Sequence, residues 1–239
     1  MIDLHSHILP GMDDGSPDAG TSMQMLRQMA VQGVTSVCAS SHYYADENSV
    51  DQFCTRRQAA WAHLQAAGLG QHADQPTVLL AAEVAYFPCI SECKDLPQLC
   101  IEGTRTLLLE MPFCEWNDFQ VEEVTALTLD LGYQLVLVHP ERFLFSKNNR
   151  RRLERLMELP IGLQVNAGSL LHLQTRKTAL HILRETDCPL LGSDAHNLTT
   201  RPPNIKEGRS VIERKLGAAC WQRMQQNAVR MLGRAFANV

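Results

Sequence analysis

The sequence predicts an α/β fold built on parallel strands, of the size of one barrel domain. Short apolar runs rich in Val, Leu and Ile, with little polar alternation, are typical of strands that are covered on both faces. These runs alternate with segments whose apolar residues recur at helical spacing, which favours parallel pairing. The chain has 239 residues, of which 45% are hydrophobic, which is enough for a sizeable core.

Seven apolar runs are the predicted strands, and each is directly followed by polar residues. In order, the runs are Ile2–Leu4, Val34–Ala39, Val78–Ala82, Thr106–Leu109, Leu135–Val138, Ile161–Val165 and Pro189–Leu191. The first predicted helix spans Pro17–Gly33, with Pro near its start, Gly at its end and Met23, Leu26 and Ala30 at helical spacing. The other predicted helices are Gln52–Gly68, Glu122–Gly132, Asn149–Glu158, Arg176–Thr186, Lys206–Leu216 and Trp221–Phe236, while 88–103 is interpreted as a short helix and loop.

Charge and composition exclude several classes of partner. The formal net charge of -4 offers no basic surface for nucleic acid. No stretch approaches the roughly 20 apolar residues that a membrane helix needs, and no signal peptide is evident at the start. We therefore expect a cytoplasmic protein without membrane insertion, in which the eight cysteines are reduced.

Residues of the metal-ligand type follow six of the seven predicted strands. In parallel barrels the carboxyl ends of the strands share one face, so these side chains should converge. His5 and His7 are two apart on a strand and therefore point the same way, and Asp194 and His196 repeat this spacing. The remaining members are His42, Glu83, Glu110 and His139.

Two questions stay open at this level. Glu83 and Glu110 each follow an apolar run, and a buried carboxylate needs a positive partner, either an arginine or a shared cation. Asp13 and Asp14 lie in the loop after the first strand, and for Asp13 we favour a turn or helix-cap role. His63, His72, His172 and His181 lie away from strand ends and are assigned no chemistry.

Nine such ligands, counting one aspartate of the 13–14 pair, exceed what one ion takes from a protein, so we predict two or three divalent ions. Imidazole with carboxylate suits manganese, iron or zinc. Clustered ions of this kind activate water and clamp the oxygens of a phosphoryl displacement. Arg142 and Arg201 follow the same strand ends, and a guanidinium matches phosphate oxygens two at a time, although surface ion pairs would also account for them.

The segment Asp3–His7 followed by Asp13–Gly15 resembles the opening of the PHP (polymerase and histidinol phosphatase) superfamily. The segments 139–142, 193–197 and 201–203 resemble its branch of bacterial protein tyrosine phosphatases from capsular and extracellular polysaccharide loci. The resemblance runs from residue 2 to the final helix. It implies a distorted (β/α)7 barrel of the PHP type, which is TIM-like, with residues 1–239 as one metallophosphatase domain.

The resemblance also implies a trinuclear site, with manganese first and iron or zinc as alternatives. One ion would take His5, His7, Glu83 and Asp194, a second Glu83, Glu110 and His139, and the third Asp14, His42 and His196. The motif thus selects Asp14 over Asp13. Arg142 and Arg201 match the phosphate-binding arginines of the family, and we count His42 with them as catalytic.

The implied substrate is the phosphotyrosine-rich tail of a bacterial tyrosine kinase, hydrolysed by a metal-bound hydroxide. No Cys-x5-Arg loop of the cysteine phosphatases is present. Where the family usually has Thr-Pro-His-His, this chain has Ser40-Ser41-His42-Tyr43, so we expect Tyr43 and Tyr44 either to line the mouth of the site or to pack. A small-molecule phosphatase of the histidinol-phosphatase type and a non-catalytic, metal-stabilised kinase regulator are the alternatives.

Overall fold

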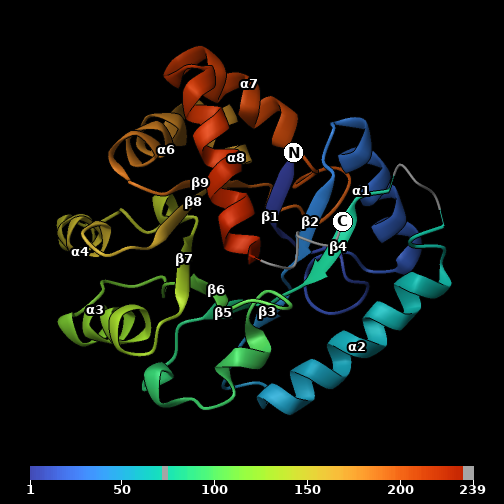
Figure 1. The fold of residues 1–239 in the computed structure, drawn as a ribbon, viewed down its shortest axis with the longest axis horizontal. Coiled ribbons are helices and arrows are strands. Elements are labelled where there is room, and N and C mark those ends of the chain that lie inside the picture. Colours follow the sequence, from blue (N-terminus) through green and yellow to red (C-terminus); the bar gives the residue numbers. More distant parts are fainter. Residues whose placement is uncertain (72–74, 234–239) are drawn as a thin grey trace.

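The computed structural model describes residues 1–71 and 75–233, and it places parallel strands at the centre of a ring of helices (Figure 1). All seven predicted strands are present. They are β1 (Ile2–Ser6), β2 (Ser36–Ala39), β4 (Thr77–Leu80), β6 (Thr106–Glu110), β7 (Gln134–Val138), β8 (Gly162–Asn166) and β9 (Pro189–Gly192). Two short strands that the sequence did not indicate, β3 (His42–Tyr43) and β5 (Glu83–Ala85), continue β2 and β4 after a break of two residues each.

These breaks distort the predicted barrel. The strands form two parallel sheets, in the orders β1-β2-β4 and β3-β5-β6-β7-β8-β9. The first and last strands meet through an isolated parallel bridge between Ser6 and Ala195. There the amide of Asp194 donates to the carbonyl of His5 at 2.8 Å. The expectation of an α/β fold with parallel strands is confirmed, and the distortion falls at the strand ends that carry His42 and Glu83.

Four of the described helices, α1 to α4, begin at a side-chain cap. Asp18 accepts from the amide of Thr21 at the start of α1 (Ala19–Val31), and Ser49 and Gln52 form a capping box at the start of α2 (Val50–Ala66). Asn117 and Gln120 form another, so α3 (Asp118–Thr125) begins before the predicted Glu122. The other predicted helices are α4 (Lys147–Met157), α6 (Leu173–Glu185), α7 (Ile205–Leu216) and α8 (Ala218–Leu232).

Several local predictions need correction. A short helix that the sequence did not indicate, α5 (Ala167–Leu171), follows β8 directly, and a π-helical turn (Ala126–Asp130) continues α3. The region 88–103 contains two 3-10 turns, Ile90–Glu92 and Leu96–Leu99. The predicted end of the last helix, Phe236, and the histidine at 72 lie outside the described residues.

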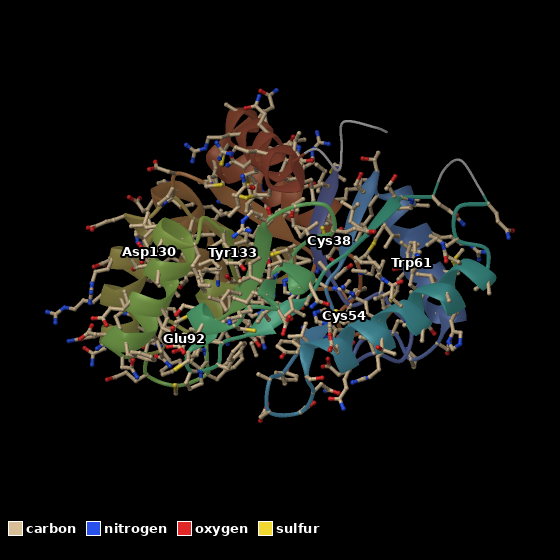
Figure 2. The ribbon with its side chains drawn as sticks, turned by 60° about the horizontal axis from the view of Figure 1, so that its bottom comes forward. Cys38, Cys54, Trp61, Glu92, Asp130 and Tyr133 are labelled. Carbon is tan, nitrogen blue, oxygen red and sulfur yellow. The ribbon has the colours of Figure 1, made fainter. Side chains whose placement is uncertain are left out.

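The core has two parts that fix the orientation of the strand ends. Apolar side chains between strands and helices form the larger cluster. A smaller one joins Leu4 of β1, Leu108 of β6 and Leu190 of β9 to Met231 and Leu232 of α8. Figure 2 shows Cys54 and Trp61 on α2, and Trp61 packs against the larger cluster. With the strands anchored in this way, their polar residues gather at the opposite, carboxyl ends.

Candidate metal centre

The two histidines at the end of β1 face one point. The side chains of His5 and His7 are fully buried, and their Nε2 atoms lie 3.1 Å apart. Gly192 permits this approach of β9 to β1, because a Cβ added there would lie only 2.7 Å from the Cβ of His5. Asp194 Oδ1 lies 3.7 Å from His5 Nε2 and 3.5 Å from His7 Nε2, so three of the four predicted ligands of the first ion surround this point.

Glu83 lies at the middle of the centre. Its Oε2 atom is 3.1 Å from His5 Nε2, 3.2 Å from His7 Nε2 and 3.0 Å from Nδ1 of His42. Its Oε1 atom accepts from Nε2 of His139 at 2.7 Å. Burial disfavours the charge of this carboxylate, but the positive charge of His5 and the hydrogen bond from His139 hold its pKa well below the usual range. One carboxylate therefore faces two groups of ligands, as a bridging ligand would.

Glu110 and His139 complete the side of the centre that Glu83 Oε1 faces. Nε2 of His139 lies 3.6 Å from Oε1 of Glu110. Burial, followed by the negative charge of Glu83, raises the pKa of Glu110 to about 7. Burial also lowers the pKa of His139, so an imidazole that is neutral at pH 7 is available as a ligand.

The third group of predicted ligands, Asp14, His42 and His196, lies nearer the surface of the protein. Asp14 Oδ1 is 3.2 Å from Nε2 of His196 and 3.6 Å from Nε2 of His42. The Asp14 side chain is 65% exposed, whereas that of His42 is 13% exposed. Burial, followed by the positive charge of His7, lowers the pKa of His196 to about 4, which keeps a lone pair available on that ring.

Hydrogen bonds orient three of the imidazoles. Nδ1 of His5 donates to Oε1 of Gln164 at 2.8 Å, Nδ1 of His7 donates to Oδ2 of Asp13 at 2.8 Å, and Nδ1 of His196 donates to the carbonyl of Asp194 at 3.0 Å. Each contact engages Nδ1 and leaves Nε2 of the ring facing the centre. Such outer partners fix the tautomer and direction of metal-binding histidines.

The residues present fit divalent ions. Among the described residues, four buried atoms that face the centre have no hydrogen-bond partner, and such atoms are costly unless an ion or water satisfies them. They are Glu83 Oε2, Asp194 Oδ1, His42 Nδ1 and His196 Nε2. Three sets offer ligand atoms within 4.8 Å of one another: His5, His7 and Glu83; His42, Glu83 and Glu110; and His7, Asp14, His42 and His196.

These sets agree in part with the expected grouping. The structure brings all nine predicted ligands into one cluster, with Glu83 shared between two sets. His7 and His42 each contribute to two sets, whereas the resemblance placed each of them on one ion. The division of the nine residues among the ions stays a prediction.

The two arginines lie at the rim of the centre. Arg201 donates to Oδ2 of Asp194 at 2.7 Å and lies 3.6 Å from Oδ2 of Asp14. The Arg142 guanidinium is 3.8 Å from the same Asp194 oxygen and stacks 5.0 Å above the ring centroid of Phe113. Both side chains keep more than a third of their surface exposed, at 39% for Arg142 and 35% for Arg201, so their remaining donors are available to a ligand.

Sequence reasoning gave Asp13 only a turn or helix-cap role and missed Gln164. The cap of α1 is Asp18, so Asp13 is not a helix cap; it makes the expected turn by accepting from the amide of Gly15 at 3.0 Å, and it also orients His7. Gln164 links His5 to Asn166, which donates to Oδ2 of Asp194 at 2.6 Å. The available signal was a glutamine in the middle of an apolar strand.

Backbone strain marks the same residues. Among the described residues outside glycine, positive φ angles occur at Cys89, at His139 (33°) and at Asp194 (53°). Such conformations cost of order 1–3 kcal/mol and concentrate at functional sites. Two of the three fall on predicted ligands, where the strained backbone turns the side chain out of the strand direction.

The two tyrosines after His42 have different roles. Tyr43 is 3% exposed and packs edge-on against Phe53, with ring centroids 5.5 Å apart. Tyr44 instead stacks on the imidazole of His42 with centroids 5.3 Å apart, and it lines a cavity together with Asp13 and Asp14. Tyr44, and not Tyr43, therefore lines the mouth of the centre.

Comparison with known proteins identifies relatives along the whole described chain. The chain is 29% identical to tyrosine-protein phosphatase YwqE of Bacillus subtilis, over 97% of this chain and 91% of that one. It is 27% identical to tyrosine-protein phosphatase CpsB of Streptococcus agalactiae, over 91% of each.

A solved structure has the same fold. It comes from work on YwqE of B. subtilis and CpsB of Streptococcus pneumoniae, described as unique metal-dependent tyrosine phosphatases, and superposes with a TM-score of 0.81 at 28% identity, covering 97% of this chain and 94% of that one. The family described as "Capsular polysaccharide synthesis, CpsB/CapC" matches residues 1–233. This chain therefore belongs to the CpsB/CapC family of capsular polysaccharide synthesis.

Proposed function

We propose that this chain is a metal-dependent phosphotyrosine-protein phosphatase whose nine clustered ligands hold two or three divalent ions. The observation that carries the proposal is the convergence on Glu83, where one carboxylate oxygen faces three imidazole nitrogens at 3.0–3.2 Å without a hydrogen bond among the described residues. A site that concentrates so many metal-ligand atoms, several without a hydrogen-bond partner among the described residues, is complementary to cations.

The donor set favours manganese, with iron or zinc as alternatives. Carboxylates and imidazoles without thiolates suit these ions. The residues that would hold them are His5, His7, Glu83, Asp194, Glu110, His139, Asp14, His42 and His196. When bound, clustered divalent ions lower the pKa of water and neutralise charge on a phosphoryl group. Gln164 and Asp13 keep the histidine rings of β1 aimed at that position.

Arg142 and Arg201 would hold the phosphate of the substrate. Each presents guanidinium donors at the rim, and planar forks of this kind bind two phosphate oxygens at once. Phe113, which is 59% exposed beneath Arg142, fixes that guanidinium and offers an apolar face to the ring of a phosphotyrosine.

We infer a protein substrate rather than a small metabolite. The centre opens to solvent at Asp14, Arg142 and Arg201, and an open mouth admits a side chain that projects from a peptide. The membership in a capsule-synthesis family makes the tyrosine-rich tail of a bacterial tyrosine kinase the favoured substrate. No helix among the described residues is long and apolar enough to cross a membrane. We infer a cytoplasmic location, which the eight unpaired cysteines support, and one domain over residues 1–239.

The test removes the central carboxylate. In Glu83→Gln we expect the bound metal, measured by elemental analysis, to fall by at least one ion per chain, and turnover of a phosphotyrosine peptide to fall at least about 100-fold. The matched control is Glu92→Gln, an exposed glutamate in the 3-10 turn Ile90–Glu92. Full activity and unchanged metal content in Glu83→Gln would contradict the proposal.

A further inference from the structure

A groove opens directly beside the metal centre. It has a volume of about 590 Å³, which lies in the range of ligand-binding clefts. Arg142, Asp194 and Arg201 form the wall that it shares with the centre, and Gly168 and Asn204 belong to its other lining residues. We call it the Asn204 groove. A substrate whose phosphate lies between the arginines would reach into it with the atoms next to the phosphorylated side chain.

The amide of Asn204 is unused by the protein. Asn204 occupies the N-cap position of α7, where an asparagine side chain usually accepts from a backbone amide, yet it makes no such bond. Its Oδ1 atom is buried without a hydrogen-bond partner in the part of the chain that the structure describes. Its Nδ2 atom lies over Gly168, 3.5 Å from the position that a Cβ on that residue would take. Oδ1 is too buried for a ligand to reach, whereas Nδ2 makes no hydrogen bond to the described residues and can donate to a ligand in the groove.

We propose that the Asn204 groove binds the main chain of the peptide substrate on one side of the phosphotyrosine, with the Asn204 amide pairing with a peptide group. This inference rests on the proposed function. The NH2 group of the carboxamide offers two donors, which complement the C=O of a backbone amide.

The rim of the groove argues against a second phosphate as its occupant. Glu207, in the first turn of α7, also lines the groove. Its carboxylate would repel an additional anion, and it tolerates an uncharged main chain. The two arginines meanwhile face Asp194, so their charge is directed toward the centre.

Two substitutions separate loss of the amide from loss of space. Asn204→Ala removes the amide without removing a cap, because the side chain makes none. Gly168→Leu fills the groove beside Asn204, because a Cβ on Gly168 would already lie 3.5 Å from the Nδ2 atom of Asn204. Gln222→Ala, an exposed amide on α8, controls for loss of an amide elsewhere on the surface.

The measurement is the ratio of kcat/KM for a phosphotyrosine peptide to kcat/KM for p-nitrophenyl phosphate, with the metal-loaded protein. Asn204→Ala should lower this ratio about three- to tenfold, the value of one hydrogen bond, and Gly168→Leu should lower it further. Gln222→Ala should leave the ratio at the parent value. Because the groove would hold the main chain on one side of the phosphotyrosine, shortening the peptide from that end should erase the difference between Asn204→Ala and the parent. Shortening it from the other end should leave the difference in place.

An unchanged ratio in both Asn204→Ala and Gly168→Leu would overturn the assignment of the groove. So would an equal loss on both substrates in proteins with unchanged thermal unfolding. Failure of the proposed function is a separate result, because it would show as a parent protein that hydrolyses neither substrate when loaded with manganese.

Discussion

Asp13 accepts a hydrogen bond from Nδ1 of His7 at 2.8 Å, so the residue beside a predicted metal ligand holds another ligand in place. Burial opposes the charge of Asp13, but the hydrogen bond and the positive charge of His7 hold its pKa below the usual range. The same Oδ2 atom accepts from the amide of His42 at 2.9 Å. One carboxylate thus ties the end of β1 to the start of β3.

This relationship predicts different results for two adjacent aspartates. Asp13→Ala frees the ring of His7 and should weaken metal binding about 10–100-fold, while the ligands themselves remain. Asp14→Ala removes a ligand from the outermost set and should lower the number of bound ions by one. A metal titration monitored by isothermal calorimetry gives both affinity and number of sites, so it distinguishes weaker binding from a lost site. Identical behaviour of the two variants would show that Asp13 does not act through His7.

The arginines should separate substrate binding from metal binding. Arg142 lies 3.8 Å from Asp194, whereas Arg201 donates to it at 2.7 Å. Arg142→Ala should lower kcat/KM for a phosphotyrosine peptide about 10–100-fold, the value of charge-assisted hydrogen bonds, with unchanged metal affinity. Arg201→Ala should lower both, because Asp194 loses a partner. Steady-state kinetics with metal titration of the same preparations checks this, and loss of metal affinity in Arg142→Ala would contradict it.

Metal affinity should rise with pH. In the metal-free protein, burial and the charge of Glu83 raise the pKa of Glu110 to about 7. Below that pH Glu110 carries a proton that an ion must displace, so affinity falls as the pH drops, by about tenfold per pH unit for each proton released. Above it, Glu110 is ionised and adds no further dependence. Manganese titrations between about pH 5.5 and 8.5 measure the slope, which should decrease in Glu110→Gln; the same slope in both proteins would exclude Glu110 from the site.

Tyr44 should act through its ring rather than its hydroxyl. Its ring stacks on His42 at a centroid distance of 5.3 Å, and such pairs contribute about 0.5–1.5 kcal/mol. Tyr44→Ala should therefore weaken metal binding at the outermost set about two- to tenfold. Tyr44→Phe keeps the stack and serves as the control. Competition titration with a coloured chelator reads the affinity, and equal weakening in both variants would assign the effect to the hydroxyl instead.

The sequence by itself determined the class of fold and the convergence of the predicted ligands. The seven long strands were predictable because burial on both faces leaves continuous apolar runs. The clustering of the nine predicted ligands was predictable because parallel topology places every carboxyl strand end on one face, so position along the chain determines position in the site. His5, Glu83 and His139 are separated widely in the chain and still meet within 2.7–3.1 Å.

Only the tertiary structure decided how those ligands are held. The short strands at His42 and Glu83 arise where β2 and β4 break, and no local pattern of two or three residues signals a strand. The partners Asp13 for His7 and Gln164 for His5 follow from side-chain direction, which depends on packing around the whole barrel. The unused amide of Asn204 is likewise visible only once α5 and α7 are side by side, because hydrogen-bond satisfaction is a property of the assembled fold.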